Sequence, residues 1–343
     1  MKKFLIMFLM VALLGTFAFA GGGKQQSAAP SGGSGGGVIK IGVSMDNLDD
    51  PFWVGIKTGL DAATKELGNK VQVDFQICQG DANKQNQQIQ NMITSGDQAI
   101  ACVYVDNVAI KQAVKLCNAK NIPFVYIDRT LDSSADAKVA WGIATDNYAL
   151  TVNGWNYMAD YAKKNNIKWK VLELVGSLTD DNVLKRTNGF KDVMAKNTDI
   201  ISLVQSVPTD YNLEKVLAGV TNALQANPDI NCIFMHSDMM ISATIQALQS
   251  ANRYAPIGQQ GHIALMPFSG NAASVDAMQN KYAEMCFGMD VYKEGHDGLM
   301  AAYDLATGNN TSKYSQPVND PGFIVTQDNL SQMLSRMYGS FAK

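Results

Sequence analysis

Short β-rich runs alternate with longer amphipathic stretches along most of the chain, and this alternation limits the possible folds more than any other feature. Between most of these runs the apolar residues recur at helical spacing, as in residues 51–67, which Gly68 follows as a stop signal. Strands that alternate with helices predict parallel sheets with helices on both faces. The ten β-rich runs are residues 38–45, 71–77, 98–105, 122–127, 138–144, 169–176, 201–207, 230–236, 262–268 and 282–288.

The length of the chain predicts two lobes. From Val38 to the last residue, Lys343, the chain exceeds the size at which one hydrophobic core usually splits in two. Ten strands are also too many for one ordinary domain of this kind. We therefore expect an α/β fold with two doubly wound parallel sheets of about five strands each.

The amino terminus has the pattern of a secretory signal peptide. Lys2 and Lys3 precede an apolar run over residues 4–19, and a small-residue cleavage pattern ends at Ala20. An uncleaved membrane anchor is the alternative, but the run is short for a bilayer-spanning helix. No Cys precedes Cys78, so we expect no lipid anchor. The sequence predicts export to a periplasmic or extracytoplasmic location.

Residues 21–37 are rich in Gly and Ser and contain no apolar residue larger than Ala, which predicts a flexible tether. A phosphate-binding loop would have to follow a strand, and these glycines follow the signal peptide. The formal net charge is -3, and Lys and Arg are scattered. The absence of a basic stripe argues against nucleic acid and anionic membranes as partners.

The cysteines indicate buried thiols rather than a disulfide framework or a metal site. Their number is odd, most stand in apolar strand-like runs, and none forms a CxxC pair. The five are Cys78, Cys102, Cys117, Cys232 and Cys286.

Open parallel sheets bind ligands outside the carboxyl ends of their strands, so candidate site residues are sought there. After the first strand, Asp50 suits a helix cap and Pro51 suits the first helical position. Phe52 and Trp53 are adjacent, so they cannot both face the core from one helix. We expect one of them to project into the crevice as an aromatic platform.

Asp128 and Arg129 follow the fourth strand directly. Side by side, they can bind a ligand, because the carboxylate accepts hydrogen bonds from hydroxyls and the guanidinium donates to ring or hydroxyl oxygens. A structural ion pair with a neighbouring loop is the alternative, and these two residues alone do not decide between them.

Several segments together resemble the ribose- and galactose-binding periplasmic proteins of type I. They are the run from Ile41 through the DDPFW motif at 49–53, then 80–102, 121–130 with the IDR motif, 144–147, and 289–295. The resemblance covers nearly the whole chain after the tether. It implies two lobes joined by a three-segment hinge, which close on a small ligand. Residues 38–144 plus 289–321 are the expected N-terminal lobe, and 145–288 plus 322–343 the C-terminal lobe.

The resemblance also implies a ligand site with contacts from both lobes. Aromatic side chains would cover the apolar faces of a sugar ring, and charged or polar side chains would bond its hydroxyl rim. The matching positions are Asp46, Asp50, Phe52, Trp53, Asp128 and Arg129 from the first lobe, and Asn182, Arg186, Tyr211, Ser237, Asp238 and Ser269 from the second.

Three positions depart from the family pattern. Ser237 stands where the family has Asn, Ser269 where it has Asp, and Met289 where it has an amide. Because an unmatched buried hydroxyl costs about 1 to 3 kcal/mol, these side chains argue against simple ribose or glucose. They favour another polyol, a modified or bulkier sugar, or a ligand with fewer hydroxyls there. The stretch 163–170 has no counterpart of the family's calcium loop, so we expect no metal and no cofactor.

We do not expect an enzyme. The chain has three His and no HExxH, GxSxG or Walker motif. His236, at a strand end, is expected to be a packing or hydrogen-bonding residue. Asp180 and Asp181 are expected to be helix caps.

The predicted function is that of a monomeric solute-binding receptor of an ABC-type importer, which binds a sugar or polyol and delivers it to a membrane permease. A ligand-sensing module that docks on a chemoreceptor or sensor ectodomain is the alternative. A transcriptional repressor of the same fold is excluded, since the signal peptide and tether stand where its DNA-binding helices would be.

Overall fold

The computed structural model describes residues 37–178 and 180–342. The predicted signal peptide and almost all of the predicted tether lie outside the described residues. The strands are β1 (Ile39–Met45), β2 (Val71–Ile77), β3 (Ala99–Cys102), β4 (Phe124–Ile127), β5 (Trp141–Thr145), β6 (Trp169–Val175), β7 (Ile201–Pro208), β8 (Cys232–Met235), β9 (Ala264–Met266), β10 (Phe268–Ser269), β11 (Met285–Gly288), β12 (Val318–Asp320) and β13 (Phe323–Thr326). The helices are α1 (Pro51–Leu67), α2 (Ala82–Thr94), α3 (Ile110–Ala119), α4 (Asn147–Asn165), α5 (Asp181–Lys196), α6 (Leu213–Ala226), α7 (Ile241–Ser250), α8 (Ala272–Gln279), α9 (Val291–Thr307) and α10 (Leu330–Met333).

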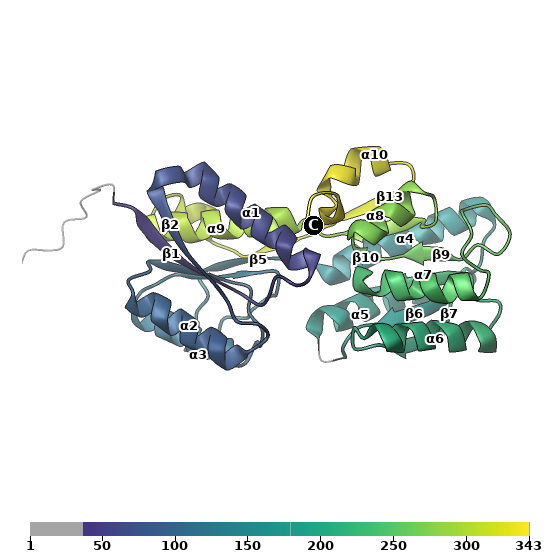
Figure 1. Ribbon diagram of the computed structural model, residues 1–343, viewed down its shortest axis with the longest axis horizontal. Helices are drawn as coiled ribbons and strands as arrows, with labels where there is room; N and C mark the ends of the chain where they lie inside the picture. Colours follow the sequence, from purple (N-terminus) through teal and green to yellow (C-terminus); the bar gives the residue numbers. More distant parts are fainter. Residues whose placement is uncertain (1–36, 179, 343) are drawn as a thin grey trace, which may run out of the picture. The chain divides into compact units, whose positions relative to one another are not determined.

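The first sheet is six-stranded and parallel, in the order β12-β5-β4-β3-β1-β2. Strand β1, next to the edge strand β2, is paired on both sides, and Val43 lies opposite Phe75 of β2 and Ala101 of β3. Helices α1 and α9 cover one face of this sheet, and α2 and α3 cover the other (Figure 1). Both faces are covered, which explains the nearly continuous apolar composition of the central strands.

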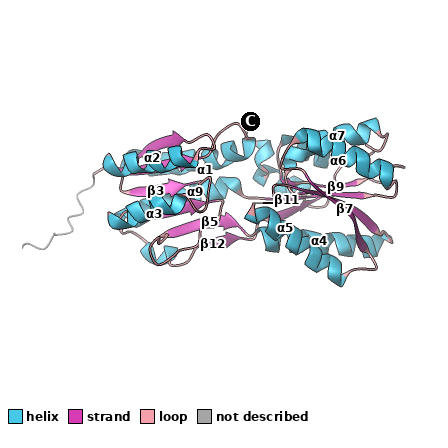
Figure 2. Cartoon of the chain, turned by 90° about the horizontal axis from the view of Figure 1, so that it is seen from below, coloured by secondary structure: helices cyan, strands magenta, loops and turns pink. Residues whose placement is uncertain are grey.

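The second half of the molecule contains a parallel four-stranded sheet, β7-β6-β8-β9, and a three-stranded sheet, β10-β11-β13. Helices α4 and α5 pack together on one side of the strands, and α6 and α7 pack together on the other (Figure 2). The chain passes between the first sheet and the other two three times. The passages run from β5 into α4, from β11 into α9, and from β12 into β13.

The expectation of two parallel sheets of about five strands each is correct for most strand pairs, but it is wrong in the number of sheets and for the antiparallel strand β13. The first sheet has six strands and the remainder divide between two sheets. Pro267, which has no N–H to donate, stands between β9 and β10 and ends the first ladder there. Strands β12 and β13 come from short segments bounded by Pro and Gly that carry a weak strand signal, and β13 runs antiparallel to β11.

The start of α1 forms as the sequence predicts. Asp50 Oδ1 accepts a hydrogen bond from the backbone N–H of Phe52 at 2.9 Å, and Pro51 is the first helical residue. The helix ends at Gly68, whose φ of 56° is in the left-handed region that favours glycine. The cap at Asp50 places Phe52 and Trp53 at the carboxyl edge of the first sheet.

The buried apolar side chains form three clusters. One lies between the first sheet and α2 and α3, and a second lies under α6 to α8. The third continues from the α1 and α9 face of the first sheet, through Met289 and Val291, to Trp155, Phe190 and Phe234 under α4 and α5. Among the described residues, no helix has the length and apolarity needed to cross a lipid bilayer. All five cysteines are buried and free, as predicted.

Candidate functional site

All twelve candidate residues line one pocket of about 630 Å³ at the carboxyl ends of the strands. They are Asp46, Asp50, Phe52, Trp53, Asp128, Arg129, Asn182, Arg186, Tyr211, Ser237, Asp238 and Ser269. The residues stand at the end of β10 or in the loops and helix starts that follow β1, β4, β6, β7 and β8, so the strand-end rule brings them together. Whether each of them contacts a ligand is a prediction.

Phe52 and Trp53 form the aromatic wall at the start of α1. Their rings meet edge to face, with centroids 4.9 Å apart. Trp53 is 9% exposed and belongs to the apolar core, whereas Phe52 is half-buried. Both rings also line the pocket, where the sequence predicts that one of them projects into the crevice.

Arg129 stands between two carboxylates and an aromatic ring. Its guanidinium lies 3.9 Å from Asp46 Oδ2 and 3.8 Å from Asp128 Oδ2, and 5.2 Å from the centre of the Trp53 ring. It also donates a 2.6 Å hydrogen bond to the carbonyl of Tyr104. Both ion pairs are long, and the Arg129 side chain is 30% exposed. The guanidinium is therefore oriented by the protein and still accessible from the pocket.

Asp46 Oδ1 is a buried acceptor that has no hydrogen-bond partner among the described residues. A buried unpaired carboxylate oxygen is costly, so the pocket offers a ligand hydroxyl a favourable partner here. Burial raises the pKa of the neighbouring Asp128 to about 6, against the lowering effect of Arg129.

Three pocket residues have positive φ angles, which are uncommon for residues other than glycine. The φ angles are 69° at Asp128, 59° at Tyr211 and 89° at Ser269. Such conformations cost about 1 to 3 kcal/mol each and persist where the surrounding structure enforces them, often at functional sites.

Arg186 is held in α5 by contacts on every side. Its Nε donates to Asn147 Oδ1 at 2.8 Å, and a terminal nitrogen donates to the carbonyl of His236. The guanidinium lies 4.1 Å from the centre of the Phe268 ring, and the residue is 6% exposed. Arg186 is therefore a fixed charge in the pocket wall. The half-buried Asn182, one turn earlier, also lines the pocket.

Tyr211 provides the aromatic ring of the second half of the pocket. Its hydroxyl donates to Asp180 Oδ2 at 2.8 Å, and Asp180 Oδ1 caps α5 by accepting from Asn182 N at 2.9 Å. The ring packs so closely on Gly176 that a Cβ added there would lie 2.5 Å from it. Burial is the main cause that raises the pKa of Tyr211 above its usual value, so the hydroxyl remains a donor at neutral pH.

Asp238 is the buried acid of the second half, with an exposed fraction of 2%. Its Oδ2 accepts from Asn271 N and from the Tyr338 hydroxyl, each at 2.6 Å. Burial raises the pKa of Asp238 to about 7, the Tyr338 hydrogen bond lowers it, and the Asp50 charge raises it again.

The three positions that depart from the family pattern lie in the same pocket wall. The Ser269 hydroxyl lies 3.4 Å from Met289 Sδ, and an Arg186 nitrogen lies 3.9 Å from the same sulfur. Ser237 Oγ accepts from Met239 N at 3.2 Å. Because thioether sulfur is a weak acceptor, this wall offers a ligand fewer strong hydrogen bonds than the Asp46 side does.

Sequence reasoning missed several residues that line the pocket. Asp180 was predicted to be a cap, and it is one, but it also lines the pocket and holds Tyr211. Asn271 follows β10 closely and could have been found by the strand-end rule. The other residues missed are Asn47, Asp49, Pro51, Leu213 and Met239.

His236 lies in the core rather than in the pocket. It is fully buried, its Nε2 lies 3.0 Å from Glu173 Oε1, and its ring packs on Phe234. The structure therefore confirms its predicted hydrogen-bonding and packing role. Within the described part of the chain, no three His, Cys, Asp or Glu side chains are grouped so that they could hold a metal ion.

Comparison with known proteins gives the family. Residues 41–310 match the periplasmic binding protein domain family. The chain is 27% identical over 273 residues to the ribose import binding protein of Bacillus subtilis, covering 80% of this chain and 83% of that protein. It is 30% identical over 215 residues to the ribose import binding protein of Escherichia coli, covering 62% of this chain and 69% of that protein.

A solved structure confirms the fold. The ABC transporter solute-binding protein of Bacillus halodurans, with bound myo-inositol, superposes with a TM-score of 0.76 at 19% identity, covering 89% of this chain and all of that one. This similarity confirms the predicted two-lobed α/β fold with a three-segment hinge. The family match confirms the resemblance that the sequence indicates. The chain belongs to the periplasmic binding protein domain family, within its sugar-binding type I branch.

Proposed function

We propose that this protein is a solute-binding receptor of an ABC-type importer, and that it binds a sugar or a related polyol in the pocket described above. The observation that carries the proposal is the combination, in one pocket, of aromatic rings and fixed charged groups from both halves of the molecule. The matched relatives are named as ribose import binding proteins, which supports the same class of ligand.

The chemistry of the pocket suits a ring that has an apolar face and a polar rim. Phe52, Trp53 and Tyr211 offer aromatic faces to C–H groups. Asp46, with a buried oxygen that has no partner among the described residues, and Arg129, which is partly exposed, offer an acceptor and a donor to hydroxyls. Charged hydrogen bonds can thus replace the water that hydroxyl groups lose on binding.

The wall formed by Ser237, Ser269 and Met289 narrows the class of ligand. It has two short hydroxyls and a thioether where the family pattern has amides and a carboxylate. We therefore expect a ligand that presents fewer hydroxyls, or a bulkier or modified group, to this wall. Simple ribose is expected to bind more weakly than such a ligand.

The relatives and the two-lobed fold support the proposed role in import. The limits of the lobes proposed from the sequence are 38–144 plus 289–321 and 145–288 plus 322–343. A ligand that bonds to Asp46 and Arg129 on one lobe and to Arg186 and Tyr211 on the other favours closure of the hinge. The closed form then presents one fixed surface to a permease. We propose an extracytoplasmic, monomeric binding protein without enzymatic activity.

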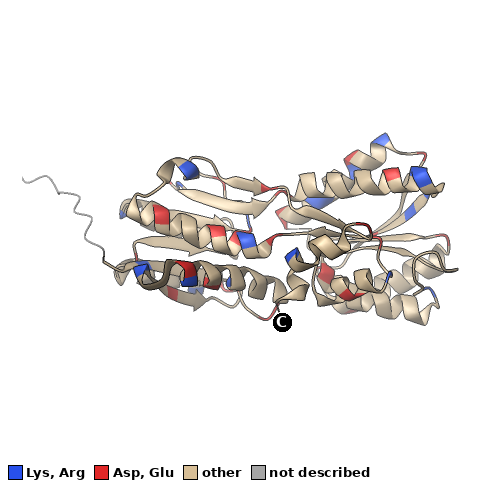
Figure 3. Ribbon diagram, turned by 90° about the horizontal axis from the view of Figure 1, so that it is seen from above, with Lys and Arg blue, Asp and Glu red and all other residues tan. Residues whose placement is uncertain are grey.

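The distribution of charged residues is consistent with a small-molecule ligand. The side shown in Figure 3 carries Lys and Arg interspersed with Asp and Glu on the helices, without a stripe of one sign. The formal net charge is only -3. Nucleic acid is therefore not a proposed partner.

The direct test is to identify what the protein carries. Mass spectrometry of small molecules released from the purified, denatured protein is expected to find a sugar or polyol. Calorimetric titration with that compound should show one site, and small-angle scattering should show a smaller radius of gyration when the compound is bound. Release of an amino acid or peptide instead would overturn the proposed ligand class, and an unchanged radius of gyration would overturn closure.

A further inference from the structure

The carboxyl-terminal segment, residues 334–342, brings a tyrosine against the proposed ligand pocket from outside its lining. Tyr338 is fully buried in the short turn Tyr338–Ser340, and its hydroxyl donates to Asp238 Oδ2 at 2.6 Å. Its ring meets the Phe52 ring edge to face, with centroids 5.8 Å apart. One side chain outside the pocket lining therefore contacts one pocket residue from each half of the molecule.

The backbone around Tyr338 is fixed by close contacts. Gly339 N donates to the carbonyl of Gly270 at 2.9 Å, and a Cβ added at Gly339 would lie only 2.1 Å from the carbonyl carbon of Asn271. Only glycine permits so close an approach of the two backbone segments, so the turn packs directly on the start of α8. Asn271, at that start, is also the residue whose backbone N–H bonds to Asp238.

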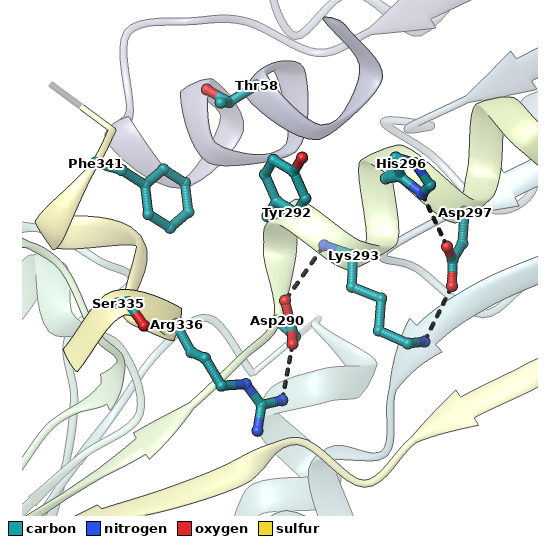
Figure 4. Close-up of a pocket in the computed structure, with 9 residues that line it drawn as sticks. All are labelled: Thr58, Asp290, Tyr292, Lys293, His296, Asp297, Ser335, Arg336 and Phe341. Carbon is teal, nitrogen blue, oxygen red and sulfur yellow. Dashed lines mark hydrogen bonds and ion pairs between the residues drawn. The ribbon is translucent and has the colours of Figure 1, made fainter. Parts of the chain in front are cut away.

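A second attachment ties the segment to the passage between β11 and α9. Arg336 donates to Asp290 Oδ2 at 2.7 Å, as the dashed line in Figure 4 shows. Arg336 and Phe341 line a separate pocket of about 530 Å³ with Lys293, His296 and Asp297 of α9. The charged groups of that pocket pair with one another, so we assign it no ligand.

The hydrogen bond from Tyr338 is made to Asp238, whose pKa lies close to neutral pH. Burial raises the pKa of Asp238 to about 7, and the Tyr338 hydroxyl lowers it from what burial alone would give. The other groups that face Asp238 are the Asp50 carboxylate from α1, the Cys286 thiol from β11, and the backbone of Gly270 and Asn271 before α8.

We infer that Tyr338 is a positioning residue of the ligand pocket: its hydroxyl orients the Asp238 carboxylate as a hydrogen-bond acceptor for the ligand, and so makes the carboxyl-terminal segment part of the binding apparatus. The inference rests on the proposed function, because it concerns the same pocket. Two donors, Tyr338 and Asn271, converge on Oδ2, so rotation of the carboxylate would break bonds to the protein. Without the tyrosine hydroxyl, that oxygen loses one of these two bonds.

The chain offers a matched control for a merely structural role. Tyr314 also donates its hydroxyl to a carboxylate, Asp304 Oδ2, at 2.8 Å, and is also buried. Tyr314 packs against Trp141 and lies outside the ligand pocket. Tyr338→Phe and Tyr314→Phe therefore remove the same kind of hydrogen bond, and each leaves the ring in place.

The first measurement needs no ligand. The carboxyl carbons of aspartate are followed by ¹³C NMR over a pH titration of the wild type and both variants, and Asp238→Asn assigns the Asp238 signal. Loss of the hydrogen bond is expected to raise the pH at which Asp238 titrates in Tyr338→Phe, and to leave it unchanged in Tyr314→Phe. Identical Asp238 titrations in the wild type and Tyr338→Phe would overturn the inference.

The second measurement is calorimetric titration with D-ribose, D-galactose and myo-inositol at pH 7. For a compound that the wild type binds, Tyr338→Phe is expected to bind about tenfold more weakly, and Tyr314→Phe to bind equally well. Equal affinity in Tyr338→Phe would contradict the positioning role. If the wild type bound none of the three, the compound released from the purified protein would take their place in the calorimetric titration. The NMR titration would still decide whether Tyr338 governs Asp238.

Discussion

The hydroxyl of Tyr211 and the Oδ2 atom of Asp180 are 2.8 Å apart. This hydrogen bond holds the aromatic ring of the second half of the pocket against Asp180, the residue that caps α5. Gly176 provides the space for that ring. A methyl group at Gly176 would approach the ring to 2.5 Å, too close for the ring to stay in place.

We therefore expect Gly176→Ala to displace Tyr211 and weaken ligand binding by about tenfold, with a loss of about 1 to 3 kcal/mol in unfolding free energy from overpacking. The control is Gly219→Ala, whose Cβ would lie 2.6 Å from Val207 Cγ1, away from the pocket. Affinity should be unchanged in that variant. Calorimetry and urea unfolding of both variants check the prediction, and an unaltered affinity in Gly176→Ala would show that Tyr211 does not contact the ligand.

Arg129→Met separates the two interpretations of the Asp128 and Arg129 pair. As a ligand contact, Arg129 should contribute about 2 kcal/mol to binding, so the variant is expected to lose roughly 30-fold in affinity. Because its ion pairs are 3.8 and 3.9 Å long, the loss of stability should come from the bonds to the carbonyls of Tyr104 and Val105, and should amount to about 1 kcal/mol.

The control for this variant is Arg253→Met. Arg253 donates to the carbonyls of Gly261, Pro228 and Ile230 at 3.0 to 3.1 Å, outside the pocket. It should lose stability and retain full affinity. If Arg129→Met behaved like Arg253→Met, the ion pair would be structural.

Ligand affinity is expected to rise with pH between 6 and 8. The pKa of Asp238 is about 7 because the residue is buried, and protonation would replace an acceptor for ligand hydroxyls with an O–H donor. If the ionised form alone binds, affinity should increase about tenfold from pH 6 to pH 8. Calorimetry across this range checks the prediction. A pH-independent affinity, or one that falls with pH, would mean that Asp238 takes part as a neutral acid or not at all.

Glu294 should make the protein less stable as pH rises. It is fully buried in α9, where burial and then the Asp128 charge raise its pKa well above the usual value, and its Oε1 accepts from the Thr145 hydroxyl at 2.7 Å. A raised folded-state pKa contributes stability fully below the unfolded value, and this stability is lost as pH rises through the folded value. Glu294→Gln keeps an acceptor for Thr145, so its stability relative to the wild type should improve from pH 5 to pH 8.

Glu173→Gln provides the opposite case. Although burial opposes it, the bonds from His236, Ser206 and Thr187 lower the pKa of Glu173. That stability is present above the unfolded pKa and lost as pH falls, so Glu173→Gln should be less stable than the wild type at pH 7. Urea unfolding at pH 5, 7 and 8 tests both variants. A constant difference between Glu294→Gln and the wild type would show that Glu294 is ionised in the folded protein.

The strand-end rule and the family resemblance together were enough to find the principal pocket residues. For β1, the helix cap at Asp50 and the aromatic residues directly after it indicate where the strand ends and which residues lie at the carboxyl edge of the sheet. Asn271 also follows a strand end, that of β10. It was not found because Pro267 separates β10 from β9, so the end of the strand was hard to place in the sequence.

Other parts of the site could not be read from the sequence because they depend on tertiary contacts. Asp180 acts on the pocket through Tyr211, which lies 31 positions away, and Tyr338 acts through Asp238, which lies 100 positions away. The left-handed φ angle at Ser269 likewise has no local signal, since serine does not favour it. Strand β12 was missed because it is short and takes its place by pairing with the longer strand β5.

The apolar cluster that runs through Met289 and Val291 has a consequence for how the protein denatures. A hinge made only of exposed linkers would let each lobe melt at its own temperature, because few contacts would cross between them. Here one buried cluster continues from one lobe into the other, so loss of one core exposes part of the other. Heating should therefore produce one calorimetric transition, and neither lobe, expressed alone, should retain the stability it has in the intact chain.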